Sequence, residues 1–118
     1  MEKNYWKTLV ITELKRALAA RNAGNEGKAR VCARRAAGWI AGEYLRRINN
    51  PVQTPSAITL LKKLGEEEIS PEISEMVGYF LIHVNPERQL PLNVDLIAEA
   101  RQLAIKLLGE DPAEFSTS

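Results

Sequence analysis

The sequence has very few of the residues that build covalent cross-links and metal sites. Cys32 is the only cysteine and His83 the only histidine among the 118 residues. A single cysteine excludes an intrachain disulfide and a cysteine-rich zinc site, and a histidine without partners at helical spacing argues against a histidine metal site. We therefore expect no metal and no cofactor. One free thiol fits a reducing, cytoplasmic compartment.

Long apolar runs and an excess of one charge are also missing. The N-terminal stretch MEKNYWKTLV contains Glu2 and no extended apolar segment, which argues against a signal peptide. No apolar run approaches the roughly 20 residues that a membrane-spanning helix needs. Sixteen basic against fifteen acidic residues give a formal charge of +1, so any surface for nucleic acid has to be local. We expect a cytoplasmic protein that does not enter a membrane.

Helical periodicity is what the sequence does contain, and turn signals interrupt it at intervals. Apolar residues recur at 3.6-residue spacing, while the alternation typical of strands is absent. The expected helices span residues 3–21, 27–48, 54–64, 72–84 and 93–109. The predicted fold class is all-α, an antiparallel bundle of four to five helices. It is expected to occupy residues 1–109 as one domain, followed by a disordered tail at 110–118.

Capping residues mark where these helices begin and end. Gly24 is expected just after the first helix, and Asn25 is the expected N-cap of the second. Thr54 and Ser70 each precede a proline, the pair that favours an N-cap followed by the first helical residue. Gly109 is expected to end the last helix.

The stretch KARVCARRAAGWIAGEYLRR, residues 28–47, holds six basic residues and one acid. A helical wheel predicts a broad apolar arc, with several side chains outside it, namely Lys28, Cys32, Arg35, Glu43 and Arg46. Most of the charged side chains of this helix are therefore expected on a solvent-exposed face. Lys7 is likewise expected on the polar side of the first helix, and Leu18 on its apolar side.

Arg30 and Arg34 fall inside the apolar arc, where a long charged side chain needs a partner or a route to water. They could reach the edge of the helix or pair with an acid such as Glu13 or Glu99. They could also line a cleft for a phosphate or an RNA backbone, since a guanidinium matches phosphate oxygens. A dimer interface is the third alternative. These two arginines are the candidate binding residues.

Gly38 and Gly42 lie one helical turn apart within the same segment. Each glycine inside a helix costs about 1 kcal/mol relative to alanine. Such a cost is explained when the backbone of another helix must approach closely, and four alanines nearby favour the same interpretation. We expect this helix to pack closely against a neighbour.

His83 is the one weak candidate for a catalytic residue. As a general base it would need an orienting partner, which the sequence alone does not show. A structural histidine is the favoured interpretation. No catalytic motif is expected elsewhere, because the chain has no glycine-rich phosphate loop following a strand.

The order of elements resembles a known family. A first helix ends in ALAARNAGNEGKARVCARRAAGWIAGEYL, then come SAITLLKKL, a helix before NPERQLP, and finally NVDLIAEARQLAIKLL. Over residues 5–109 this layout is similar to the HEPN superfamily, small helical bundles named for their association with nucleotide binding. The resemblance implies an antiparallel bundle, often a homodimer, that is commonly paired with a nucleotidyltransferase partner protein in systems like toxin–antitoxin pairs.

Many members of that superfamily are metal-independent ribonucleases with a motif in which four to six residues separate an arginine from a following histidine. This sequence departs from the motif, since no arginine precedes His83 at that spacing and Arg88 follows it. The resulting hypothesis is a non-catalytic, dimeric binding module for a protein partner, or for a nucleotide or RNA at a local basic patch. The alternatives are a divergent ribonuclease and a purely structural interaction domain.

Overall fold

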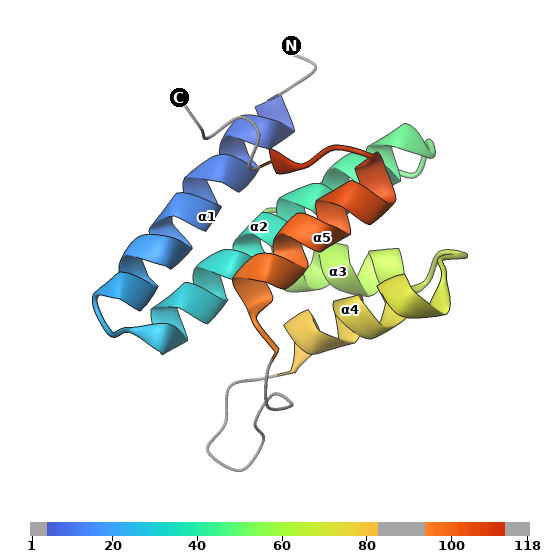
Figure 1. Cartoon of the computed structure of the whole chain (residues 1–118). Helices are drawn as coiled ribbons and strands as arrows, with labels where there is room; N and C mark the ends of the chain where they lie inside the picture. Colours follow the sequence, from blue (N-terminus) through green and yellow to red (C-terminus); the bar gives the residue numbers. More distant parts are fainter. Residues whose placement is uncertain (1–4, 83–93, 113–118) are drawn as a thin grey trace.

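A computed structural model of the chain describes residues 5–82 and 94–112. Five helices account for most of them (Figure 1): α1 (Tyr5–Asn22), α2 (Glu26–Arg47), α3 (Ala57–Gly65), α4 (Pro71–Leu81) and α5 (Leu96–Leu108). Within the described ranges there is no strand, so the predicted all-α class is confirmed.

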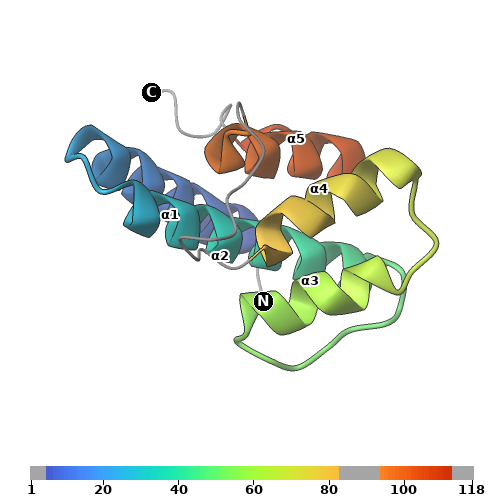
Figure 2. The ribbon, with the colours of Figure 1, turned by 90° about the horizontal axis from the view of Figure 1, so that it is seen from below.

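Helix α2 is the centre of the bundle. It forms an antiparallel hairpin with α1 and packs against α3 and α5, while α4 packs against α3 and α5 (Figure 1). Figure 2 shows α5 and α3 on opposite sides of α2. The largest fully buried side chains come from every helix and from the segment after α5: Val10, Cys32, Ile40, Leu45, Leu61, Leu64, Phe80, Leu103 and Pro112.

Local signals set most helix boundaries as predicted. The side chain of Asn25 caps α2 by accepting a hydrogen bond of 3.0 Å from the Lys28 backbone N–H. Ser70 caps α4 in the same way, with Pro71 in the first turn. Gly24 (φ 80°) and Gly109 (φ 73°) adopt the left-handed conformation after α1 and α5, which suits glycine.

Two helix starts and one helix end differ from the prediction. The N-cap of α3 is Ser56, because Thr54 instead accepts a hydrogen bond from the Ser56 backbone N–H and forms a turn ahead of the helix. Helix α5 begins at Leu96, where Asp95 accepts from two backbone N–H groups, rather than near residue 93. Helix α4 ends at Leu81 instead of continuing to residue 84.

The packed domain extends beyond the predicted boundary at residue 109. Glu110 forms ion pairs with Lys7 and Arg47, Asp111 pairs with Arg101, and Pro112 is buried. Residues 110–112 therefore belong to the fold and are not part of a disordered tail. The remainder of the expected tail, residues 113–118, lies outside the described part of the chain.

The faces of α1 and α2 also differ from a simple helical wheel. Cys32 and Glu43, expected outside the apolar arc, are buried, and so is Lys7 in α1, whereas Leu18 is exposed. The reason is the central position of α2, whose neighbours on three sides bury a wider part of its circumference than one apolar arc would. Lys7 and Glu43 are buried, and each pairs with a partly exposed side chain of opposite charge.

The close approach predicted for the glycines is present at one of the two positions. A Cβ added at Gly38 would lie 2.6 Å from the Cβ of Ala57 and 2.7 Å from its Cα, so the start of α3 rests directly on α2. A Cβ at Gly42 would lie 3.5 Å from the side chain of Leu60, an ordinary contact. Gly38 is therefore required by packing, and Gly42 is not.

These two glycines provide a matched test of that packing. We expect Gly38→Ala to lower the free energy of unfolding by about 1–3 kcal/mol, because the methyl group would overlap the Ala57 backbone. Gly42→Ala should leave stability unchanged or raise it by up to about 1 kcal/mol through its better helix propensity. Urea denaturation of both variants measures the difference, and equal stabilities would contradict the close contact.

Candidate functional site

A groove of about 550 Å³ opens on the side of α2 that lies between α1 and α3. Its apolar walls come from both helices, from α2 and from the segment before α3: Tyr5, Trp6, Leu9, Trp39, Val52 and Leu60. We call this the aromatic groove, because two tryptophans and a tyrosine line it. It is mainly apolar, with Glu43 and Arg46 at one end.

Helix geometry explains how these side chains come together. Positions 5, 6 and 9 of α1 share one face, as do positions 35, 38, 39, 42 and 46 of α2, at spacings of three and four residues. The two helices run antiparallel, so residues near the start of α1 meet residues near the end of α2. The groove persists because α1 and α3 both pack on α2 with little contact between each other.

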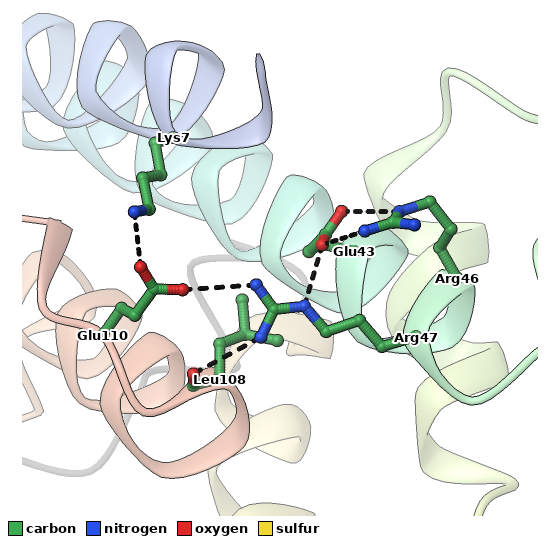
Figure 3. A network of polar contacts seen from close by, with 6 residues as sticks. All are labelled: Lys7, Glu43, Arg46, Arg47, Leu108 and Glu110. Carbon is green, nitrogen blue, oxygen red and sulfur yellow. Dashed lines mark hydrogen bonds and ion pairs between the residues drawn. The ribbon is translucent and has the colours of Figure 1, made fainter. Parts of the chain in front are cut away.

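A network of charged side chains fixes the end of the groove at Glu43. The Glu43 carboxylate accepts hydrogen bonds from Arg46 (2.6 and 3.0 Å) and from Arg47 (2.8 Å). Arg47 also donates to the Leu108 carbonyl and to Glu110, which pairs with Lys7 (Figure 3). The network therefore ties α1, α2 and the end of α5 together.

The electrostatics of this network favour the ionised carboxylates. Burial opposes ionisation of Glu43, but the hydrogen bonds from Arg46 and Arg47 outweigh it, so the pKa of Glu43 lies below its ordinary value of 4.5. The hydrogen bond from Lys7 lowers the pKa of Glu110 in the same direction. The cations of Lys7 and Arg47 each lie 5.8 Å from the centre of the Trp6 ring, within cation–π range.

Two buried polar atoms in the described ranges have no hydrogen-bond partner, and both belong to α1. They are Nε1 of Trp6 and Oε1 of Glu13, seven residues apart on the same helical face. Trp6 lines the aromatic groove, and Glu13 lines a smaller pocket of about 220 Å³ next to it, which shares Trp39 and Leu60 with the groove. Buried polar groups are normally paired, so both atoms call for an explanation.

Arg34, predicted as a binding residue, contacts the end of α4. Its Nε donates to the Phe80 carbonyl at 2.7 Å and its Nη2 to the Ile82 carbonyl at 3.4 Å. These carbonyls belong to the last turn of α4 and its C-cap, where a helix lacks internal donors and favours a positive charge. Burial lowers the pKa of Arg34 below its ordinary value, although an arginine remains charged at neutral pH.

Among the described residues, neither Glu13 nor Glu99, the acids considered as partners for Arg30 and Arg34, pairs with either arginine. Glu13 is within 3.5 Å of Arg16 instead, and the pKa of Glu99 is raised by burial and by neighbouring acids. Arg30 is half-buried; the pKa of Glu26 is lowered first by a hydrogen bond from Arg21, with a smaller contribution from the Arg30 charge. The structure therefore does not bring the two arginines together around one acid.

The remaining candidate residues of the sequence analysis are His83, Arg88 and Cys32. His83 and Arg88 lie outside the described residues, so the structure does not position the catalytic candidate. Cys32 is a buried free thiol in the core. In the described ranges, no group of three or more acidic, histidine or cysteine side chains could hold a metal ion. None of the helices described combines the length and hydrophobicity needed to cross a bilayer.

Sequence reasoning missed the residues of the aromatic groove. Trp6 and Leu9 belong to the apolar pattern of the first helix, and nothing in that linear pattern separates groove from core. The one available signal was Glu13, an acid within the apolar pattern of the first helix, which was considered only as a partner for the arginines. No protein-family model, curated protein or solved structure matches the chain.

The burial of Glu43 predicts a dependence of stability on pH. Because its pKa is lowered in the folded state, Glu43 stabilises the fold above its unfolded pKa, and that contribution is lost as the pH falls below about 4.5. Glu43→Gln should lower the free energy of unfolding at pH 7 by about 1–3 kcal/mol, and its stability should depend less on pH below 4.5.

Urea denaturation between pH 7 and pH 2.5 measures both effects. The control is Glu68→Gln, which removes an exposed carboxylate from the loop between α3 and α4. An identical pH profile for Glu43→Gln and the unaltered chain would show that Glu43 contributes no linked stability.

The contact of Arg34 with α4 gives a second stability prediction. Arg34→Met keeps a long unbranched side chain but leaves the Phe80 carbonyl without its donor, so we expect a loss of about 1–3 kcal/mol. The adjacent Arg35→Met, at an exposed position, should change stability by less than about 0.5 kcal/mol. Thermal or urea unfolding compares them, and equal effects would contradict a structural role for Arg34.

Proposed function

We propose that this chain is a non-catalytic helical binding module, of the HEPN type that its layout resembles, which docks a helix of a partner protein in the aromatic groove. The observation that carries the proposal is the pair of unpartnered buried atoms, Trp6 Nε1 and Glu13 Oε1, beside an apolar groove. Both atoms are enclosed in the free chain, so a partner that brings an acceptor and a donor to this face would satisfy them once the Trp6 and Glu13 side chains rotate outward.

The composition of the groove suits a protein partner. Tryptophan and tyrosine are the residues that most often dominate protein interfaces, since they bury a large apolar area with few rotatable bonds. Helices already cover α2 on its α1, α3 and α5 sides, and a partner helix laid between α1 and α3 would cover the face left open. Helix-in-groove docking uses such an apolar channel.

Charge favours a protein over RNA at this face. The groove and the adjoining pocket carry two acids, Glu13 and Glu43, and two arginines, Arg35 and Arg46, so their formal charges cancel. Arg46 is further neutralised by its hydrogen bonds to Glu43. A phosphate backbone needs a clear local excess of positive charge, which this face does not have.

Site-specific photocrosslinking in the native host tests the docking proposal. A benzophenone amino acid replaces Gln53, which is exposed and lines the groove, or Gln102, which is exposed on α5 as a matched control. We expect an adduct with one protein from position 53 only. Trp39→Ala should abolish the adduct, while Val31→Ala, a change on α2 outside the groove lining, should not.

The affinity of a peptide from the crosslinked partner then measures how much Trp39 contributes to binding. Loss of a central tryptophan from a docked interface weakens binding by about 2 kcal/mol or more, roughly 30-fold in Kd. If the adduct at position 53 joins two copies of this chain, the occupant is a second copy, and light scattering should show a dimer. The absence of a position-specific adduct, or its persistence in Trp39→Ala, would overturn the proposal.

A further inference from the structure

The pocket next to the aromatic groove is lined by one acidic and one basic side chain. Glu13, Arg35 and Trp39 line it together with the small residues Gly38, Pro55 and Ala57, around a volume of about 220 Å³. The pocket lies where α3 begins against α2, at the tight Gly38–Ala57 contact. Because Trp39 lines both cavities, an occupant of the groove passes directly beside this pocket.

The carboxylate of Glu13 is incompletely satisfied. The side chain is only 11% exposed, yet Oε1 has no hydrogen-bond partner. Its other oxygen has one long contact of 3.5 Å to Arg16, whose side chain is 60% exposed. A buried carboxylate oxygen without a donor is unfavourable, and a charged donor is the partner that offsets its desolvation best.

We propose that this pocket binds a primary ammonium or guanidinium group, delivered by a lysine or arginine of the partner helix. The Glu13 side chain rotates to turn its enclosed carboxylate oxygen Oε1 toward the pocket, where the N–H of the cation donates to it, and the alkyl stem packs against Ala57 and Trp39. The Trp39 ring adds a cation–π contact to the same group. The assignment to a partner side chain rests on the proposed function, whereas the chemistry of the pocket rests on Glu13 itself.

Arg35 is expected to weaken cation binding in this pocket, the opposite of the effect expected for Glu13. It lines the same pocket from an exposed position, and no hydrogen bond or ion pair joins it to Glu13 in the described ranges. Its positive charge opposes a bound cation across the pocket. Removal of this charge should therefore strengthen cation binding, while removal of the Glu13 charge should weaken it.

Titration of the full chain with n-butylammonium chloride tests the proposal. Amide chemical shifts of Gly38, Trp39 and Ala57 report binding, with n-butanol as the neutral probe and potassium chloride at matched ionic strength. We expect saturable shifts with a Kd of about 1–10 mM, consistent with so small a ligand, and none with n-butanol.

The variants give opposite expected changes. Glu13→Gln keeps the shape of the side chain and should weaken binding by about fivefold or more, since it removes the charge that the ammonium meets. Arg35→Gln should tighten binding by about twofold. Glu68→Gln, an exposed loop change, should leave the Kd unaltered. Because Arg35 is exposed, its variant tests the charge effect even if Glu13→Gln fails to fold.

Several outcomes would overturn the subsite: no saturable shift in the unaltered chain, equal binding of n-butanol, or unchanged binding in Glu13→Gln. Weaker binding in Arg35→Gln would also overturn it. Butylammonium binding without a crosslink at position 53 would support the subsite and contradict the docking proposal. A position-specific crosslink without butylammonium binding would do the reverse.

Discussion

The close packing of α2 against three other helices is the constraint on which the remaining structure depends. Alanines and Gly38 let α3 approach the α2 backbone at Ala57, and the same helix carries α1 and α5 on its other sides. A larger residue at position 38 would push the start of α3 outward. Both candidate cavities lie beside this contact, so the packing that stabilises the domain also sets their shape.

The basic residues of α2 act mainly within the protein. Arg46 and Arg47 neutralise the buried Glu43, Arg47 extends the network to α5 and Glu110, and Arg34 supplies donors to the end of α4. A count of positive charges therefore overstates the attraction of this helix for nucleic acid. Each guanidinium that donates to a protein acceptor is less available to a phosphate.

The groove and the pocket differ from this satisfied network. There, the aromatic side chains of Tyr5 and Trp39 are only partly covered, and two polar atoms of α1 are buried without partners in the described ranges. Because buried polar groups are normally paired, this concentration on one face is the basis of the docking proposal. Because the formal charges on that face cancel, we propose a protein rather than RNA as the occupant of the groove. The unpaired oxygen of Glu13 is the reason for proposing a cationic side chain in the pocket.

The all-α class, the five helices and most caps could be predicted from the amino-acid order, because helix periodicity and the Asn25, Ser70 and Gly109 signals are local. The burial of Glu43 and Cys32, the partners of Arg34 and the position of the groove could not be predicted in this way and follow from the tertiary structure. These depend on which helices meet around α2, and contacts such as Arg34 to Phe80 join residues far apart in the chain. A helical wheel drawn for one helix contains no information about how many other helices pack around that helix.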